Sequence, residues 1–289
     1  MHHNTVARHG KLLKAPTTIS DRKFLDQKKK LKAFWGTMNC RYPRPDASMR
    51  LFCFPWAGGG AGFYTAWGED ITEDVEVFGV CLPGRENRFK DPCCDNAKDT
   101  IDWIVRTIHD EYFDKPFAFY GHSMGALLAF LVALELKQHY KREPEHMFLS
   151  GTTAPHSPHR SSRMLNVSEM TKDEFLEKLK HLGGTPPEVF ENPELMDIYL
   201  PPLYADFCMV PQLRYEHNSD SKPPLTCPID FFDGMEDIDH DIEAWRQVTS
   251  GSFSFRKMPG GHFFLKEPEN TKKLTNYINL RFSGFEDIV

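Results

Sequence analysis

The chain of 289 residues is 40% hydrophobic and 26% charged, a composition that is typical of a globular protein and not of a disordered one. No run of about 18 apolar residues occurs, so no membrane span is expected. The net charge of −6 is unevenly divided, because residues 1–50 hold 12 Lys and Arg against 3 Asp and Glu, whereas the rest of the chain holds 23 against 38. The acidic main body argues against nucleic-acid binding.

The basic N-terminal part, residues 1–38, is interpreted as a disordered extension before the folded body. A mitochondrial transit segment is the alternative, since residues 28–30 are lysines and acids are few. Asp21 and Asp26 interrupt the basic run and favour the extension. The seven cysteines form no Cys-x-x-Cys pair, and no apolar signal segment is visible, so we expect reduced thiols and a cytoplasmic protein.

The first predicted strand, 50–55, leads into a glycine run at 58–60. Glycines at this place let the backbone approach a ligand closely, and the N–H of Ala57 is the candidate donor to a developing negative charge. A phosphate-binding loop is the alternative, but no Lys-Ser or Lys-Thr pair follows the glycines. A second buried strand, 75–82, and a helix with apolar periodicity, 100–112, come next.

The stretch 117–140 contains the strongest chemical signal in the chain. An apolar run, 117–120, precedes Gly-His-Ser-Met-Gly at 121–125, and an apolar helix, 126–136, follows. This order fits the nucleophile elbow of an α/β hydrolase, in which a tight strand-to-helix turn exposes the hydroxyl of Ser123. A glycine-flanked turn with an ordinary surface serine is the alternative, and the flanking strand and helix argue against it.

The character of the chain changes after the predicted strand 146–150. Residues 156–226 are rich in Pro, Ser and His and show no strand pattern, so we interpret them as a helical lid. Thr171 and Glu174 form a capping box that opens a helix. The pair Pro201-Pro202 is expected to break the apolar stretch 195–209. Strands at 229–232 and 253–258 and helices at 242–248 and 271–282 then complete a mostly parallel sheet with helices on both faces.

Two motifs at predicted strand ends supply the partners of the serine. Asp237 follows one strand and His262 the next, and the chain order Ser, Asp, His is that of the α/β-hydrolase fold. We predict that His262 is the general base and acid, that Asp237 orients it, and that the N–H of Met124 is the second donor to the oxyanion. The alternatives are other acids on the same loop and other histidines: Asp233, Glu236, Asp239, Asp241, His122, His156 and His159.

Five spaced motifs occur in order along the chain: FPWAGGG, LPGRE, GHSMG, GMEDI and PGGHFFL. Together, from about Asn39 to Phe282, they resemble the type II thioesterases, and within them the animal medium-chain fatty acid synthase thioesterases. The resemblance implies an α/β hydrolase with a helical lid, a triad of Ser123, Asp237 and His262, and oxyanion donors at Ala57 and Met124.

The resemblance also implies the activity: release of free, medium-chain fatty acids from the phosphopantetheine arm of the acyl carrier protein of fatty acid synthase through an acyl-enzyme. No metal or organic cofactor is needed for this chemistry, and we expect a monomer. The alternatives are an editing thioesterase of polyketide or peptide synthases, a carboxylesterase, and a catalytically silent scaffold that only binds a partner. The intact triad argues against the silent scaffold.

The predicted domains are a hydrolase core at 39–155 and 227–289, interrupted by the lid at 156–226. Apolar lid side chains are hypothesised to line an acyl tunnel or, alternatively, to pack the lid helices together: Leu176, Leu179, Phe190, Leu195 and Phe207. Acyl carrier proteins are generally acidic, so docking onto this acidic body needs local basic residues. The candidates are Arg85, Arg88, Arg160 and Arg163, with an internal ion pair as the alternative role of Arg85.

Overall fold

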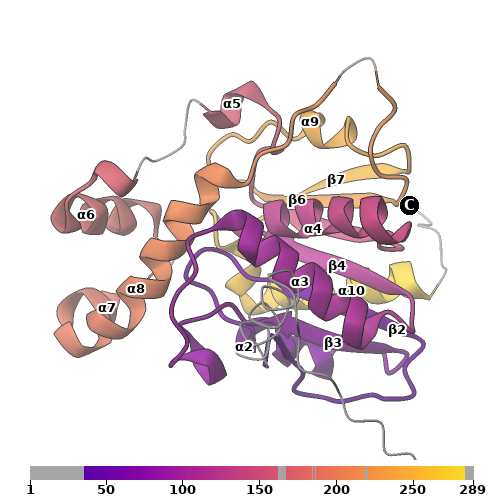
Figure 1. Cartoon of the computed structure of the whole chain (residues 1–289), viewed down its shortest axis with the longest axis horizontal. Coiled ribbons are helices and arrows are strands. Elements are labelled where there is room, and N and C mark those ends of the chain that lie inside the picture. The colour runs from indigo at the N-terminus through magenta and orange to yellow at the C-terminus, as the bar shows by residue number, and fades with distance from the viewer. Residues whose placement is uncertain (1–35, 162–166, 184, 186, 219–220, 284–289) are drawn as a thin grey trace, which may run out of the picture. The chain divides into compact units, whose positions relative to one another are not determined.

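The computed structural model describes residues 36–161, 167–183, 185, 187–218 and 221–283 (Figure 1). Almost all of the predicted N-terminal extension therefore lies outside the described residues, as does Arg163. The described residues fall in the compact unit Gly36–Val289.

A seven-stranded sheet forms the centre of this unit, in the order β1-β3-β2-β4-β5-β6-β7. All neighbouring strands are parallel except β1, which pairs antiparallel with β3. The four strands β2 to β5 are buried almost throughout, as their largely apolar sequences require in a sheet covered on both faces. The strands are β1 (Met38–Asn39), β2 (Met49–Phe54), β3 (Val75–Val80), β4 (Phe117–His122), β5 (Met147–Ser150), β6 (Ile229–Gly234) and β7 (Phe253–Met258).

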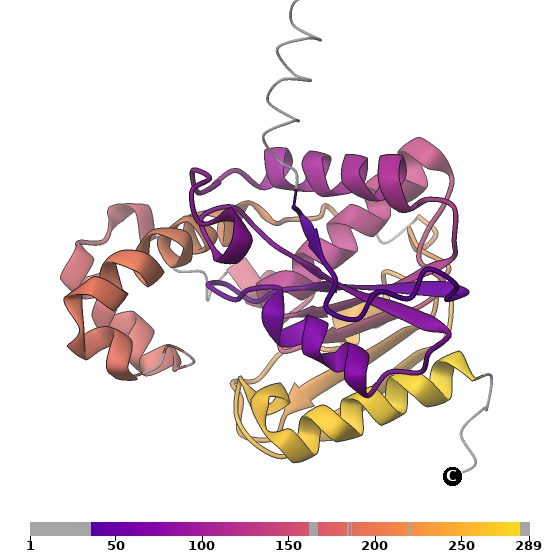
Figure 2. The ribbon, with the colours of Figure 1, turned by 90° about the horizontal axis from the view of Figure 1, so that it is seen from below.

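Helices cover both faces of the sheet (Figure 2). The long helices α3 (Ala97–Tyr112) and α4 (Met124–Tyr140) lie on one face, and α10 (Pro268–Phe282) lies on the other. On the α10 face, Leu274 and Ile278 share one core cluster with Tyr64 and Trp67 from α2 (Gly62–Thr65) and η1 (Ala66–Glu69). The connections η2 (Glu86–Arg88), α9 (Glu243–Arg246) and η5 (Phe264–Lys266) complete the core.

The predicted lid lies between β5 and β6, and its described residues contain helices and no named strand. It consists of α5 (Pro158–Ser161), η3 (Val167–Glu169), α6 (Lys172–Leu182), α7 (Pro187–Glu191), α8 (Pro193–Met209) and η4 (Val210–Gln212). The capping box is present, because the Thr171 hydroxyl accepts the Glu174 N–H and the Glu174 carboxylate accepts the Thr171 N–H. These helices have their own apolar cluster around Val167, Phe175, Leu179 and Leu203.

The prediction that Pro201-Pro202 breaks the lid helix is wrong, because α8 runs through both prolines. Two adjacent prolines remove two backbone donors, and the helix tolerates this loss because other contacts hold it. Asn192 caps its first turn by accepting the N–H groups of Glu194 and Leu195. Leu203 packs in the lid cluster immediately after the proline pair. Packing of the apolar face therefore outweighs the local helix-breaking preference.

Two sequence features have simple structural outcomes. All seven cysteines are free thiols. None of the helices in the described part of the chain combines the length and the apolar character needed to cross a bilayer.

Candidate active site

The turn between β4 and α4 holds Ser123 in a strained backbone conformation, with φ 56° and ψ −118°. The strain requires small neighbours. A Cβ on Gly121 would overlap the carbonyl of Gly125, and a Cβ on Gly125 would overlap the carbonyl of Phe54 on the adjacent strand. Gly-x-Ser-x-Gly is thus required by sterics here, and the turn places the serine at the N-terminus of a 17-residue helix, which favours negative charge.

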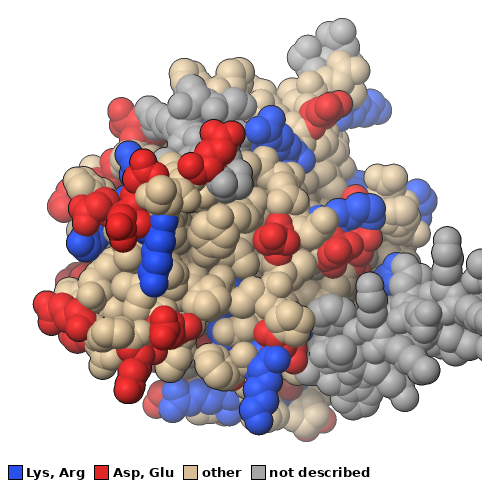
Figure 3. All heavy atoms as spheres, turned by 60° about the vertical axis from the view of Figure 1, so that its left-hand side comes forward, with Lys and Arg blue, Asp and Glu red and all other residues tan. Residues whose placement is uncertain are grey.

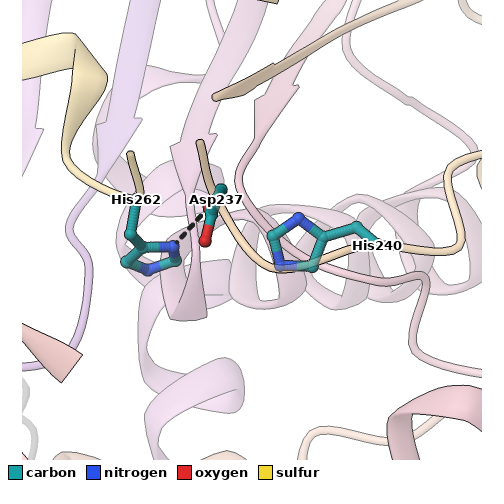
Figure 4. Close-up of side chains that lie close together, drawn as sticks. All are labelled: Asp237, His240 and His262. Atoms are coloured by element: carbon teal, nitrogen blue, oxygen red, sulfur yellow. Dashed lines mark hydrogen bonds and ion pairs between the residues drawn. The ribbon is translucent and has the colours of Figure 1, made fainter. Parts of the chain in front are cut away.

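Ser123, His262 and Asp237 are joined by a chain of hydrogen bonds. His262 Nε2 lies 3.0 Å from Ser123 Oγ, and His262 Nδ1 lies 2.8 Å from Asp237 Oδ2. Figure 4 shows Asp237 between the rings of His262 and His240, with the Asp237–His262 bond dashed. The loops after β6 and β7 bring the acid and the histidine to the carboxyl edge of the sheet, where β4 delivers the serine.

The protonation of Asp237 determines which nitrogen of His262 carries the proton. Burial acts to raise the pKa of Asp237, but the hydrogen bond from His262 and the charges of His262 and His240 outweigh it, so the pKa is lowered. An ionised carboxylate can only accept hydrogen bonds, so Nδ1 of His262 must donate. The lone pair of Nε2 then faces the serine hydroxyl, which is the arrangement that general-base activation requires.

The other acids of the loop have different partners. Both oxygens of Asp233 are engaged, Oδ1 by His240 Nδ1 at 2.9 Å and Oδ2 by Lys257 Nζ at 3.0 Å. Asp241 accepts the Ser157 hydroxyl at 2.6 Å. Of the candidate carboxylates, Asp237 is the one hydrogen-bonded to His262, as the sequence predicted.

The alternative histidines lie elsewhere or face away. His122 is fully buried behind the serine, with Nδ1 2.9 Å from Ser150 Oγ and its ring centroid 5.0 Å from that of His262. Burial, reinforced by His262 and His240, lowers the pKa of His122 well below its ordinary value, so it stays neutral. In the lid, His156 Nε2 meets the side chain of Gln247 instead.

Asp237 and His262 also belong to a group of side chains that has the composition of a metal site. Ligand atoms of Asp237, His240 and His262 all lie within 4.8 Å of one another. Two of them are already hydrogen-bonded to each other, and His262 also contacts Ser123. A metal ion here would therefore compete with the Ser123–His262–Asp237 chain and not assist it.

A buried ion pair ties the lid to the predicted oxyanion loop. Asp206 on α8 is fully buried and pairs with Arg85 through two bonds, Nη1–Oδ2 at 2.7 Å and Nη2–Oδ1 at 2.8 Å. The same Asp206 Oδ2 accepts the N–H of Gly58 at 2.7 Å, and Arg85 donates to the Gly59 carbonyl at 2.9 Å. The two charges thus fix the loop that carries Ala57. The sequence offered no signal for Asp206, because an acid on a lid helix reads as a solvated charge.

A cavity of about 480 Å³ adjoins the serine and is within the usual range of small-molecule sites. Ser123, His262, Ala57 and Met124 line it together. The opposite wall comes from the lid, from α6 and α8. The lid residues in this wall are largely apolar, notably Leu179, Leu182, Tyr199, Leu203, Phe207 and Val210.

The structure divides the five predicted acyl-contact residues into two groups. Leu179 and Phe207 line the cavity. Leu176 and Phe190 instead pack against the lid cluster, and Leu195 is half-buried in the first turn of α8 and lines no part of the cavity. Tyr199 and Leu203 were missed, although they precede Phe207 at intervals of four, the spacing of one helical face. The expected break at the prolines concealed this periodicity.

The predicted carrier-docking arginines are buried in the three cases that the structure describes. Arg85 forms the internal pair with Asp206, and Arg88 is 2% exposed, bonded to Asp91 and stacked over Trp103. Arg160 is 7% exposed and lines the cavity. The docking assignments of Arg88 and Arg160 are therefore wrong, and for Arg85 the alternative role, an internal ion pair, is the one that the structure shows. On the lid-side face shown in Figure 3, the coloured Lys and Arg side chains are scattered among Asp and Glu and form no continuous basic area.

The parallel sheet, the strained serine turn and the Ser-Asp-His order define an α/β hydrolase. Comparison with known proteins narrows the class, because the family model of the Thioesterase domain matches residues 49–281. The chain belongs to the thioesterase domain family. This confirms the fold and the resemblance inferred from the sequence motifs.

Relatives and solved structures agree with this assignment. The medium-chain S-acyl fatty acid synthase thioesterase of Rattus norvegicus is 40% identical over 241 residues, covering 83% of this chain and 90% of the relative. The gramicidin S biosynthesis protein GrsT of Aneurinibacillus migulanus is 37% identical over 224 residues, covering 76% and 84%. The structure of the RedJ thioesterase from the prodiginine pathway of Streptomyces coelicolor superposes with a TM-score of 0.71 at 29% identity, covering 86% of this chain and 98% of that one.

Proposed function

We propose that this protein hydrolyses acyl thioesters on the acyl carrier protein of a fatty acid synthase and releases free fatty acids of medium length. The observation that carries the proposal is the Ser123–His262–Asp237 hydrogen-bond chain. Its Ser123 and His262 line a largely apolar cavity. The similarity to medium-chain fatty acid synthase thioesterases, at 90% coverage of the rat relative, supports the substrate class.

Acylation begins with the serine. His262 Nε2 removes the proton of Ser123, whose oxygen attacks the thioester carbonyl. The negative charge on the carbonyl oxygen is stabilised by the N–H groups of Met124 and Ala57, of which Met124 is the first residue of α4. The tetrahedral intermediate collapses, the C–S bond breaks, and the thiol leaves with a proton from His262. A thiol has a pKa of about 8.5, so the thiolate is a good leaving group.

Deacylation repeats the sequence with water. His262 takes a proton from water, hydroxide adds to the acyl-enzyme, and Ser123 recovers its proton as the free acid departs. Asp237 stays ionised throughout, holding His262 in the required tautomer and stabilising the imidazolium that forms twice per cycle. The acyl chain lies in the cavity under α6 and α8, where each buried methylene contributes about 0.8 kcal/mol. The depth of the cavity therefore selects chain length.

A second function has a specific observation in its favour. The 37% identity to a gramicidin S biosynthesis protein extends over 84% of that protein, so editing of acyl groups on a peptide or polyketide synthase is the alternative. Both functions use the same thioester chemistry and differ in the carrier and in the acyl group.

Product analysis separates these possibilities. A fatty acid synthase reaction with the protein added should release shorter free acids than the synthase alone, and the Ser123→Ala protein should leave the products unchanged. A product distribution that the wild-type protein does not alter would remove fatty acid synthase from consideration and leave editing. A matched pair of octanoyl thioester and octanoyl oxygen ester tests the reaction type, because a carboxylesterase would hydrolyse the oxygen ester at least as well.

A further inference from the structure

Arg160 is the most unusual side chain in the wall of the cavity. It is 7% exposed, and within the described part of the chain its guanidinium makes one hydrogen bond, from Nη2 to the Val210 carbonyl at 2.6 Å. Among the described residues no carboxylate pairs with it. Burial lowers the pKa of Arg160 to about 10, with the neighbouring charge of Arg214 acting in the same direction.

A buried cation without a counter-ion is costly to fold. A guanidinium needs paired acceptors for its five donors, and one carbonyl satisfies only a part of them. Arg85, equally buried, shows the usual solution in this protein, a bidentate contact to a carboxylate. The corresponding partner of Arg160 is lacking among the described residues, and Arg160 faces a cavity that receives substrate.

The other ionisable side chains of the wall have the same electrostatic character. Arg160 and Lys178 both line the cavity, along with His181, His240 and His262, and no Asp or Glu of the described chain lines it. The protein as a whole carries a net charge of −6, so this is a locally basic interior in an acidic molecule. Lys178 is exposed whereas Arg160 is buried, so an anion bound by Arg160 would be shielded from solvent and one bound by Lys178 would not.

We propose that Arg160 is an anion-binding subsite of the acyl pocket and that the substrates include acyl chains bearing a second carboxylate. This inference rests on the proposed thioester hydrolysis and specifies its substrate class. The reaction is unchanged: water adds across the C–S bond, and a free dicarboxylic acid and a thiol result. A methyl-terminated chain that reached Arg160 would instead strip water from the guanidinium without replacing its hydrogen bonds.

The phosphate of the phosphopantetheine arm is another anion on the same substrate. It belongs to the part of the arm nearest the carrier protein, outside the acyl pocket, whereas Arg160 is more than nine-tenths buried. The geometry therefore favours the acyl carboxylate, and the two anions are separated by the choice of thiol in the assay.

The test compares two series of N-acetylcysteamine thioesters, which contain no phosphate. One series has ω-carboxyacyl chains from malonyl to suberyl, and the other has methyl-terminated chains with the same number of carbons. At each chain length, the kcat/KM of the ω-carboxyacyl thioester is divided by that of the methyl-terminated thioester. In the wild type, this ratio should peak at one chain length. Arg160→Gln should lower that peak roughly 10- to 100-fold, the effect of losing a charge-assisted hydrogen bond. The peak ratio of the Arg160→Lys protein should lie between those of the wild type and Arg160→Gln, because lysine keeps the charge and lacks the planar guanidinium.

Arg214→Gln is the matched control, since it removes a nearby exposed arginine that does not line the cavity. It should leave the peak in place. Labelling of Ser123 by a fluorophosphonate verifies that each variant has an intact site. As a second readout, the Ser123→Ala protein should melt at a higher temperature with the preferred ω-carboxyacyl thioester, and the Ser123→Ala/Arg160→Gln protein should not.

Two results would overturn the proposal, and a third would contradict the thioesterase function on which it rests. Equal ratios in wild type and Arg160→Gln at every length would overturn it. A loss in Arg160→Gln that appears with octanoyl-phosphopantetheine but not with octanoyl-N-acetylcysteamine would also overturn it, and would assign Arg160 to the phosphate. Absence of turnover of both series by a folded wild-type protein would instead contradict the proposed thioesterase function itself.

Discussion

Replacing Asp206 by Ala tests whether the buried ion pair holds both the lid and the oxyanion loop. The change removes the carboxylate that accepts two bonds from Arg85 and one from Gly58 N–H. Arg85 is left 8% exposed with an uncompensated charge. Breaking a buried pair by removing one partner costs about 3–5 kcal/mol. For a unit of this size, 1 kcal/mol corresponds to roughly 2–4 °C, so the melting temperature should fall by roughly 6–20 °C.

The catalytic effect should be separable from the loss of stability. Gly58 follows Ala57 directly, so releasing its N–H loosens the loop that carries the proposed oxyanion donor. Losing one such donor outright costs roughly 10²–10³ in kcat, and loosening it should cost a part of this, roughly tenfold. The fall should be in kcat more than in KM for a short acyl thioester, measured well below the melting temperature.

Two further variants sharpen the test. Asp197→Ala removes an exposed acid from the same helix and should change stability by no more than about 0.5 kcal/mol. The double variant Arg85→Met/Asp206→Leu removes both charges and should regain much of the stability, because apolar replacements of buried pairs are often neutral. It still leaves Gly58 N–H without its acceptor, so activity should not return. An Asp206→Ala protein with wild-type melting temperature and kcat would refute the anchoring argument.

Three other predictions concern catalysis, chain length and pH. Ser123→Ala and His262→Ala should each abolish nearly all turnover, and the double variant should be little worse, because residues that act as a unit are non-additive; multiplicative losses in a kinetic comparison would contradict this. Leu179→Phe should shorten the released acids whereas Leu176→Phe, away from the cavity, should not, as chromatography of the products would show. For Asp230, burial acts to raise the pKa, but hydrogen bonds and neighbouring positive charges lower it from 3.8 to about 2. Its stabilisation, about 2 kcal/mol, is therefore present above pH 4 and lost as pH falls towards 2. Asp230→Asn should flatten the stability curve in that acid range, measured by urea unfolding.

The arrangement of Ser123, His262 and Asp237 in one hydrogen-bonded chain was predictable from the sequence, because each of these residues is tied to a local backbone signal. The serine needs its two glycines for steric reasons, and the acid and the histidine follow strands whose apolar runs are easily recognised. Parallel strands end at one edge of a sheet, so residues that are distant in sequence meet there without any further information. Even the choice of Asp237 over Asp233 agrees with their positions in the chain. Asp233 lies within β6, and its two carboxylate oxygens contact His240 and Lys257.

The errors came from residues whose role depends on packing between distant segments. Arg88 and Arg160 look like surface charges in a sequence that is otherwise acidic, and for Arg85 the sequence left a docking role and an internal ion pair open. Their burial depends on Asp206, Trp103 and the lid, which lie far along the chain or make no charge pattern of their own. The continuity of α8 through its prolines has the same origin, because tertiary contacts of Leu203 and Asp206 decide it. Local propensity predicts elements well and their mutual contacts poorly.

The position of the Asp206–Arg85 ion pair, which anchors α8 to the loop of Ala57, also constrains how the cavity admits an acyl chain. Leu203, which lines the cavity, and Asp206, which binds the oxyanion loop, are three residues apart on α8, so wall and anchor move together. Separating α8 from the loop would break the three hydrogen bonds that the Asp206 carboxylate accepts from Arg85 and Gly58, and a hydrogen bond to a charged group contributes about 1.5–3 kcal/mol. Displacing α6 would break mainly apolar contacts such as those of Leu179, at roughly 1.5–3 kcal/mol for each side chain. We therefore expect the cavity to open on the α6 side while α8 stays fixed, which keeps the oxyanion donors in place between turnovers.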